Sequence, residues 1–372
     1  MSTFWIVAFT LVGLVNVALA LIVLLHRSSG NEPAGLLRVC VAAFAVVVAS
    51  AFETAGLALL GLRMFGLMHI AWIDISVVVP ISGIAVFVGA LLGRPSKASV
   101  KVVAALGLAV IPIAIDAMFI TPFDLRLETA DVALPAAREG VLPLKVAILA
   151  DLQSTTVAEH QRNAIATIMS TEPDLILIPG DIFQGTESMF HAQAPSFREL
   201  LSELHAPGGV FAVQGNTDTG RLFSQLFDGT GIRVLNDEVV RFTVHDRKVA
   251  LLGLSMAHFV WDERCQEFAR EPGEDEVRIA MAHIPDAVYS LPRGSSRVDL
   301  FVAGHTHGGQ VSFPFIGPPV ILTSVPKAVA AGGLHDLDGR RIYISRGVGM
   351  ERGLAPRIRW RVPPEVSLLT LK

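Results

Sequence analysis

The sequence predicts an N-terminal bundle of transmembrane helices followed by an α/β domain, and three observations predict this division. Four apolar stretches occupy residues 1–120. Only 10 of these 120 residues are charged, whereas the following 252 residues hold 54 charged side chains. In the second part, strand-like apolar runs alternate with helical patterns, which is typical of layered α/β proteins. We therefore predict a transmembrane domain over residues 1–120, a linker over 121–143 and a globular domain over 144–372.

The four apolar stretches have the length that a helix needs to cross a bilayer, which is about 20 residues for a hydrocarbon core about 30 Å thick. They lie at residues 4–25, 39–60, 67–92 and 100–120. The first stretch is too long for a signal peptide and has no basic segment before it, so we expect a retained span. Glu53, His69 and Asp74 fall within spans, where ionisable groups mark polar pathways or interhelical pairs. We expect a hydrogen-bonded pair such as Glu53 with His69.

Positive charges orient the predicted bundle, because short loops rich in Lys and Arg stay in the cytoplasm. The second connection carries only Arg63. The first and third connections carry Arg27, Arg38, Arg94, Lys97 and Lys101. We therefore predict that both termini and the globular domain lie on the outer face.

Composition excludes several protein classes. A formal net charge of −4 argues against a nucleic-acid-binding protein that depends on basicity, and 52% hydrophobic residues argue against disorder. Only Cys40 and Cys265 are present, so neither a disulfide framework nor a Cys-rich zinc module can form. Any metal must be bound by His, Asp, Asn or similar side chains.

The globular part contains six predicted strands and two predicted helices. The strands are Lys145 to Ala150, Leu175 to Ile178, Val210 to Val213, Val249 to Leu254, Val277 to Met281 and Leu300 to Ala303. The helices lie near Val157 to Ser170 and Ser196 to Leu204.

Polar, metal-competent residues follow directly after five of these strands. They are Asp151 with Gln153, Asp181, Asn216 with Asp218, His283, and the pair His305 and His307. Because the carboxyl ends of strands in open α/β sheets form the crevice where ligands bind, these five places can converge on one site.

Taken singly, most of these residues have ordinary structural explanations. An Asp after a strand is commonly a turn or a helix cap, and a lone His283 is commonly a hydrogen-bonded structural residue. Asp218 orients a ligand or water, or caps a helix over Thr219 to Phe227. The run Gly304-His305-Thr306-His307-Gly308-Gly309 is different. Two histidines one residue apart, with glycines on both sides, indicate metal coordination.

The ordered set resembles the calcineurin-like metallophosphoesterases. Their pattern is Asp-x-His, Gly-Asp, Gly-Asn-His-Asp or Gly-Asn-His-Glu, a lone His, and Gly-His-x-His. The resemblance spans residues 144–372, and the tail Ser345 to Gly349 with Pro364-Glu365 is similar to the membrane-associated or exported bacterial branch. The resemblance implies a four-layer α/β/β/α sandwich with two divalent metal ions at the edge of its sheets.

The resemblance also implies a role for each matching residue. One metal would be held by Asp151, Gln153 and His307, and the other by Asn216, His283 and His305, with Asp181 bridging both. The expected catalytic residues are Asp181, Asn216, His305 and Asp218. Oxygen ligands combined with imidazoles suit Mn, Fe, Zn or Mg.

Two positions depart from the family pattern. Gln153 stands where relatives have a metal-binding His, and its neutral amide oxygen is a weaker ligand for a borderline-soft ion. Thr217 stands where many relatives have a His thought to assist departure of the leaving group. Because a positioned general acid contributes about 10²- to 10⁴-fold, we expect slow reactions with poor leaving groups.

We hypothesise a membrane-anchored phosphoesterase of a bacterial cytoplasmic membrane, with its domain on the extracytoplasmic side. A hydroxide bridging two cations would attack phosphorus while the metals stabilise the phosphoryl charge. The substrate would contain a phosphoester, phosphodiester or diphosphate bond, and a lipid-linked compound is one option. We predict no nucleic-acid partner, and the sequence leaves the oligomeric state open.

The alternative is a membrane sensor or scaffold that binds metal or phosphate with weak or no catalysis, which Gln153 and Thr217 favour. One further segment, Phe313 to Ile321, is too apolar for an ordinary exposed loop. It either packs on the core or forms a lip toward the bilayer.

Overall fold

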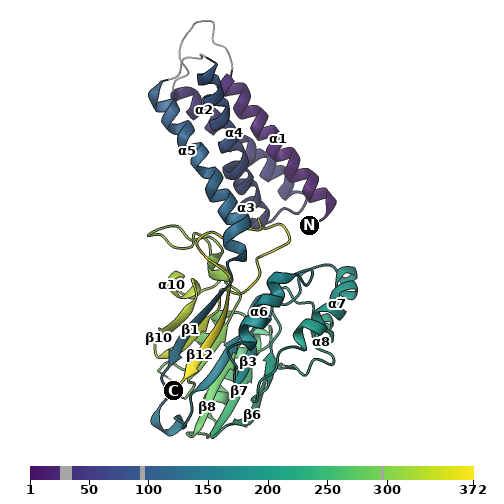
Figure 1. The fold of residues 1–372 in the computed structure, drawn as a ribbon, viewed down its shortest axis with the longest axis vertical. Helices are drawn as coiled ribbons and strands as arrows, with labels where there is room; N and C mark the ends of the chain where they lie inside the picture. The colour runs from purple at the N-terminus through teal and green to yellow at the C-terminus, as the bar shows by residue number, and fades with distance from the viewer. Residues whose placement is uncertain (26–35, 93–96, 295–296) are drawn as a thin grey trace. The chain divides into compact units, whose positions relative to one another are not determined.

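The computed structural model describes residues 1–25, 36–92, 97–294 and 297–372 and divides into two compact units (Figure 1). The helical unit comprises Met1–Phe119 and Glu351–Arg357, and the sheet unit comprises Ile120–Met350 and Ile358–Lys372. Arg27 and Arg94, two of the charges used to predict orientation, lie outside the described residues.

The helical unit contains four helices that are long and apolar enough to cross a membrane. These candidate spans run over Thr3–Leu25, Leu37–Ala58, Met64–Leu91 and Ala98–Phe123, in agreement with the predicted stretches. The third is built from α3 (Met64–Ile73), the π-helical turn η1 (Asp74–Val78) and α4 (Val79–Leu91). The others are α1 (Thr3–Leu25), α2 (Leu36–Ala58), and α5 (Ala98–Ile115) with its π-helical end η2 (Asp116–Ile120).

The polar residues of the helical unit do not pair as predicted. The Asn16 amide donates hydrogen bonds to Glu53 over 3.3 Å and to Asp74 over 2.9 Å, so both carboxylates share a donor from α1. His69 instead contacts the Leu354 carbonyl over 3.1 Å and stacks on Phe9. The predicted Glu53–His69 pair is therefore wrong, because Asn16, an uncharged residue, satisfies both acids.

The sheet unit is built from two six-stranded mixed sheets. In spatial order the first sheet holds β1 (Arg126–Val132), β12 (Glu365–Leu371), β2 (Leu144–Ile148), β3 (Leu175–Ile178), β4 (Val210–Ala212) and β5 (Arg233–Val234). The second holds β10 (Gly333–Leu337), β11 (Arg340–Ile344), β9 (Leu300–Ala303), β8 (Glu276–Met281), β7 (Arg247–Gly253) and β6 (Glu238–Val244).

Three apolar layers hold the sheet unit together. One lies between the sheets, where Val146 and Leu177 of the first meet Leu251 and Ile279 of the second. Another packs α6 (Glu159–Met169), α7 (Glu187–Leu201) and α8 (Gly220–Leu226) on the first sheet. The last packs α9 (Trp261–Arg270) and α10 (Lys327–Ala330) on the second sheet. This arrangement is the predicted four-layer α/β/β/α sandwich.

Two segments differ from the sequence prediction. The predicted linker contains β1, which pairs in parallel with β12 over its whole length. Helix α7 begins nine residues before the predicted Ser196, because the Thr186 hydroxyl caps it by accepting from the Met189 N–H, and Pro195 lies inside it. Neither difference affects the strands that precede the predicted ligands.

Candidate metal centre

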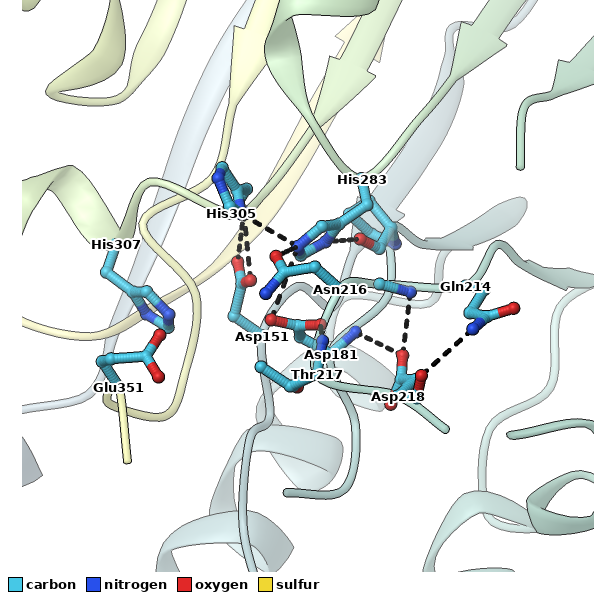
Figure 2. A network of polar contacts seen from close by, with 12 residues as sticks. Asp151, Asp181, Gln214, Asn216, Thr217, Asp218, His283, His305, His307 and Glu351 are labelled. Carbon is cyan, nitrogen blue, oxygen red and sulfur yellow. Dashed lines mark hydrogen bonds and ion pairs between the residues drawn. The ribbon is translucent and has the colours of Figure 1, made fainter. Parts of the chain in front are cut away.

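The predicted ligands follow the carboxyl ends of strands from both sheets. Asp151, Asp181, Asn216, His283 and His305 lie together in one cluster, whereas His307 lies to one side of it (Figure 2). Asp151 follows β2, Asp181 follows β3 and Asn216 follows β4, while His283 and the histidine pair follow β8 and β9. β2, β3 and β4 are parallel neighbours, as are β8 and β9, so each group of loops leaves its sheet at one edge. The sheet polarity therefore assembles residues that are more than 150 positions apart.

Most of these side chains sit on strained backbone. A left-handed φ, which costs a non-glycine residue about 1–2 kcal/mol, is found at Asp151 (47°), Gln153 (37°), Asp181 (56°), His305 (72°) and His307 (49°). Such conformations persist only when the surroundings enforce them, and they cluster at functional sites.

Two glycines let the carboxylates come close to neighbouring backbone. A Cβ atom on Gly215 would lie 2.1 Å from Asp181 Oδ1, and one on Gly304 would lie 2.6 Å from Asp151 Oδ2. Both distances are shorter than any real Cβ contact, so only glycine fits. The glycines that precede Asn216 and His305 are thus required by the position of the acids.

Three potential ligand atoms lie around the Nε2 atom of His283. Asn216 Oδ1 lies 2.7 Å from it, His305 Nδ1 lies 3.1 Å from it and Asp181 Oδ2 lies 3.4 Å from it. His283 donates its Nδ1–H to the Pro179 carbonyl over 2.7 Å, and His305 donates its Nε2–H to the Leu322 carbonyl over 3.3 Å. A neutral imidazole carries one proton, so the two nitrogens that face the centre carry lone pairs.

A cation bound between these atoms would relieve the repulsion of the facing lone pairs. Burial lowers the pKa of His283 to about 4, which keeps this imidazole neutral and its lone pair free at pH 7. We call Asn216, His283 and His305 the second-metal group. Its donor set and its tautomers fit a divalent metal ion.

The remaining ligands, Asp151, Gln153 and His307, form what we call the first-metal group. Asp151 accepts the His305 backbone N–H with both oxygens, over 3.0 and 3.1 Å. Asp151, Asp181 and His283 offer ligand atoms that all lie within 4.8 Å of one another. His307 is buried, and within the described part of the chain its Nε2 has no hydrogen-bond partner. Among the described residues, His307 does not belong to the set formed by Asp151, Asp181 and His283, so it is not brought to these carboxylates as the resemblance implies.

His307 is surrounded by groups that favour its neutral form. Burial, and then the charge of Arg359, hold its pKa well below the ordinary value. The Arg359 Nη2 atom lies 3.4 Å from His307 Nδ1. Because Arg359 can only donate, His307 Nδ1 accepts, and the neutral ring carries its proton on Nε2, which in this arrangement presents an N–H rather than a lone pair.

Asp218 is buried, and its side chain accepts hydrogen bonds from backbone N–H groups. Its carboxylate accepts N–H groups from Asp181 over 2.7 Å, Gly215 over 2.9 Å and Ile182 over 3.0 Å (Figure 2). Burial, and then the charge of Asp181, raise its pKa to about 7. The alternative reading as a helix cap is wrong, because Thr219 occupies the N-cap position of α8 and no side chain caps that end. Asp218 thus joins the loops that carry Asp181 and Asn216.

The structural role of Arg359 is not predicted from the sequence. Its buried guanidinium donates to the carbonyls of Gly349 over 2.6 Å, Arg346 over 2.7 Å and Gly347 over 3.1 Å. A Cβ on Gly347 would lie 2.5 Å from Asp151 Cβ, so Arg359 holds the segment that borders this ligand. Arg359 is the central one of three arginines that alternate with apolar residues in Arg357-Ile358-Arg359-Trp360-Arg361, a pattern that does not single it out.

Comparison with known proteins agrees with this geometry. The sequence model of the calcineurin-like phosphoesterase family matches residues 144–309. The uncharacterized metallophosphoesterase YkuE of Bacillus subtilis (strain 168) is 30% identical over 228 residues, which cover 60% of this chain and 76% of that protein. The phosphodiesterase YaeI of Escherichia coli (strain K12) is 30% identical over 245 residues, which cover 63% and 84%. With this match and the ordered ligands, the chain belongs to the calcineurin-like phosphoesterases, a family of metal-dependent phosphohydrolases.

Proposed function

We propose that this protein is a membrane-anchored phosphodiesterase that uses two divalent metal ions. The observation that carries the proposal is the convergence of unprotonated ligand atoms on His283 Nε2, with Asn216 Oδ1 at 2.7 Å. The phosphodiesterase named among the relatives supports the choice of a diester over other phosphoesters.

In this proposal each group of side chains holds one metal, and Asp181 contributes to both sites. Asp151, Gln153 and His307 hold the first, and Asn216, His283 and His305 hold the second. The mixture of carboxylate, amide and imidazole ligands suits Mn, Fe, Zn or Mg. Bound there, such ions supply a water nucleophile of lowered pKa and neutralise charge on the phosphoryl oxygens.

The protein's own residues position this chemistry. Asp218 keeps the Asp181 and Asn216 loops at a constant separation through its three short hydrogen bonds to backbone N–H groups. Thr217 donates its backbone N–H to Asp181 Oδ1 over 2.8 Å, and its side chain cannot serve as a general acid at neutral pH. We therefore expect substrates whose leaving group departs without protonation to react fastest.

The four candidate spans support anchoring in a bacterial cytoplasmic membrane, and the distribution of basic residues supports an extracytoplasmic sheet unit. A substrate at the membrane surface, such as a lipid-linked phosphodiester or diphosphate, follows from this anchoring. The exposed apolar side chains of Phe315 and Ile316 support the same class.

One experiment tests both the activity and the orientation. Intact spheroplasts that express the full chain are given Mn²⁺ and bis(p-nitrophenyl) phosphate, a chromogenic diester anion that does not cross the membrane. We expect turnover without lysis, and a loss of about 10²- to 10³-fold in the variants Asp181→Ala and His305→Ala. Asp228→Ala and His191→Ala, which remove exposed side chains of the same types, should leave the rate unchanged.

The outcomes separate the alternatives. Turnover that appears only after lysis would show that the orientation is wrong while the activity stands. A purified protein that binds metal but turns over no diester with any divalent ion would replace the enzyme by the sensor or scaffold, which Gln153 and Thr217 favour.

A further inference from the structure

The segment Ser312 to Leu322, which we call the apolar loop, exposes large apolar side chains. Phe315 is fully exposed, Ile316 is 71% exposed, and Phe313 and Leu322 are also exposed. No charged residue occurs from Val311 to Pro326. The sequence alone leaves open whether this segment packs on the core. The exposure of Phe315 and Ile316, the tip of the loop, shows that the tip does not.

The apolar loop is held in a defined shape at its base. Phe313 and Gly317 exchange backbone hydrogen bonds of 3.0 and 2.9 Å, and the Ser312 N–H bonds to the Trp360 carbonyl over 3.1 Å. The Phe313 ring meets the Trp360 ring edge-on, with centroids 5.6 Å apart. The exposed residues Phe315 and Ile316 therefore belong to a turn with a defined hydrogen-bonded conformation.

The loop borders the metal centre. It follows His307–Gly309 closely in sequence, and at its far end the Leu322 carbonyl accepts the His305 Nε2–H over 3.3 Å. This hydrogen bond directs His305 Nδ1 toward His283. The same segment that exposes Phe315 and Ile316 thus fixes the tautomer of a candidate ligand.

The chain enters the sheet unit from the fourth candidate span at the same edge. β12 is antiparallel to β2 and parallel to β1, so β1 begins where β2 ends. At that end Arg126 lies opposite Glu365, whose N–H bonds to the carbonyl of Gly347 beside Asp151. η2 ends at Ile120, and the residues from there to Arg126 reach about 20 Å at most. The end of a span is therefore covalently close to this edge.

We propose that Phe315 and Ile316 insert into the acyl region of the bilayer that holds the four spans, so that the metal centre acts on phosphoester groups at the lipid surface. The proposal rests on the membrane anchoring described under the proposed function. A bilayer suits the tip better than a protein does, because a specific protein interface buries more than about 1,000 Å² and two side chains cannot supply this area.

The first arm of the test measures where the tip lies. The full chain is reconstituted in vesicles with brominated acyl chains, and an environment-sensitive dye is attached to Phe315→Cys in a Cys40→Ser background. Cys265 stays unlabelled because it is buried, which raises its pKa to about 12. Val141→Cys is the matched control, since Val141 is 89% exposed and precedes the opposite, amino end of β2.

We expect the brominated lipid to quench the dye at position 315 and to leave the dye at position 141 unchanged. Equal quenching at both positions, or none at position 315, overturns the proposal. A dye at position 315 that is shielded from water but not quenched by brominated lipid also overturns it, because the occupant is then a protein or a second copy.

The second arm measures turnover of two substrates with the same leaving group, phosphatidyl-p-nitrophenol in phosphatidylcholine vesicles and soluble bis(p-nitrophenyl) phosphate. The test variant combines Phe315→Asn with Ile316→Ser, because Asn tolerates the φ of 64° at position 315. We expect its turnover of the lipid substrate to fall by about a hundredfold or more, as the burial of two apolar side chains predicts, and its turnover of the soluble substrate to stay unchanged.

If the variant loses turnover equally on both substrates, or on neither, the apolar loop does not act in lipid binding. If the wild type turns over neither substrate, the proposed function is wrong. The dye-quenching experiment still measures whether the tip of the apolar loop enters the lipid.

Discussion

The two metal groups differ in how completely the protein prepares them. In the second-metal group, two hydrogen bonds to carbonyls set the tautomers of His283 and His305, and Asn216 Oδ1 and His305 Nδ1 lie 2.7 and 3.1 Å from His283 Nε2. In the first-metal group, His307 Nε2 is buried without such a contact in the described residues, and Gln153 replaces an imidazole. We propose that the second site is organised before a metal ion binds, whereas the first would depend on the ion to complete it.

The largest effect on this comparison is expected from Asp218→Asn. The raised pKa of Asp218 shows that the fold disfavours its charge, so the loss in this variant comes from hydrogen bonding. The amide NH2 replaces one carboxylate oxygen and faces backbone N–H donors, and a buried donor left without a partner costs about 1–3 kcal/mol. We expect the free energy of unfolding to fall by about 1–3 kcal/mol and metal affinity to fall about 10- to 100-fold. Metal content per chain and denaturant melts measure both quantities.

The control for Asp218→Asn is Thr217→Val, which removes a hydroxyl that has no hydrogen-bond partner among the described residues. This change should shift stability by no more than about 0.5 kcal/mol. Wild-type metal content in Asp218→Asn would show that the loops hold their positions without the carboxylate.

A smaller effect is expected from Gln153→His, which restores an imidazole to the first-metal group. The left-handed φ of 37° at this position is one that His tolerates. We expect affinity for Zn²⁺ or Mn²⁺ in the weaker site to rise roughly tenfold, about 1.4 kcal/mol, as seen by titration calorimetry. Gln153→Asn, which keeps the amide but shortens it, should give no rise. An unchanged affinity in Gln153→His would remove this residue from the ligand set.

The smallest effect concerns pH and His160, which donates its Nε2–H to the Val348 carbonyl over 3.1 Å and so supports the segment beside Asp151. Burial lowers the pKa of His160 below its ordinary 6.5. The unfolded chain therefore takes up the proton first as pH falls below 6.5, and stability is lost in that range and is pH-independent above it.

We expect the melting temperature of metal-free protein to fall less between pH 7 and pH 5 in His160→Gln than in the wild type. His191→Gln, which replaces an exposed histidine of α7, should keep the wild-type dependence. Parallel pH profiles for wild type and His160→Gln would show that His160 titrates alike in both states.

How far the sequence predicts this fold depends on where each strand lies. β3 and β9 match their predicted ranges, because both are buried on two faces and read as continuous apolar runs. The sequence does not predict the four edge strands β1, β5, β6 and β10, nor the interior strands β11 and β12, so edge position explains only part of what is missed. β1 is missed because most of Arg126–Val132 is exposed or half-buried and its pattern is mainly polar.

The sequence likewise predicts only some parts of the candidate site. Its side-chain ligands are predicted because each stands directly after a strand and carries a recognisable donor atom. The roles of Asp218 and Arg359 are not predicted, since both act on backbone N–H and carbonyl groups that no sequence spacing identifies. The tautomers of His283 and His305 likewise depend on the Pro179 and Leu322 carbonyls, which the fold alone brings into range.

The left-handed conformations at Asp151, Gln153, Asp181, His305 and His307 restrict what evolution can place there. β-branched residues are excluded by sterics, whereas Asp, Asn, His and Gly adopt such a φ at least cost. Most of these tolerated residues are metal ligands. If Gln153 is a ligand, as we propose, the scaffold would accept one ligand type in place of another, and so change its preference among ions, while the backbone conformation stays the same.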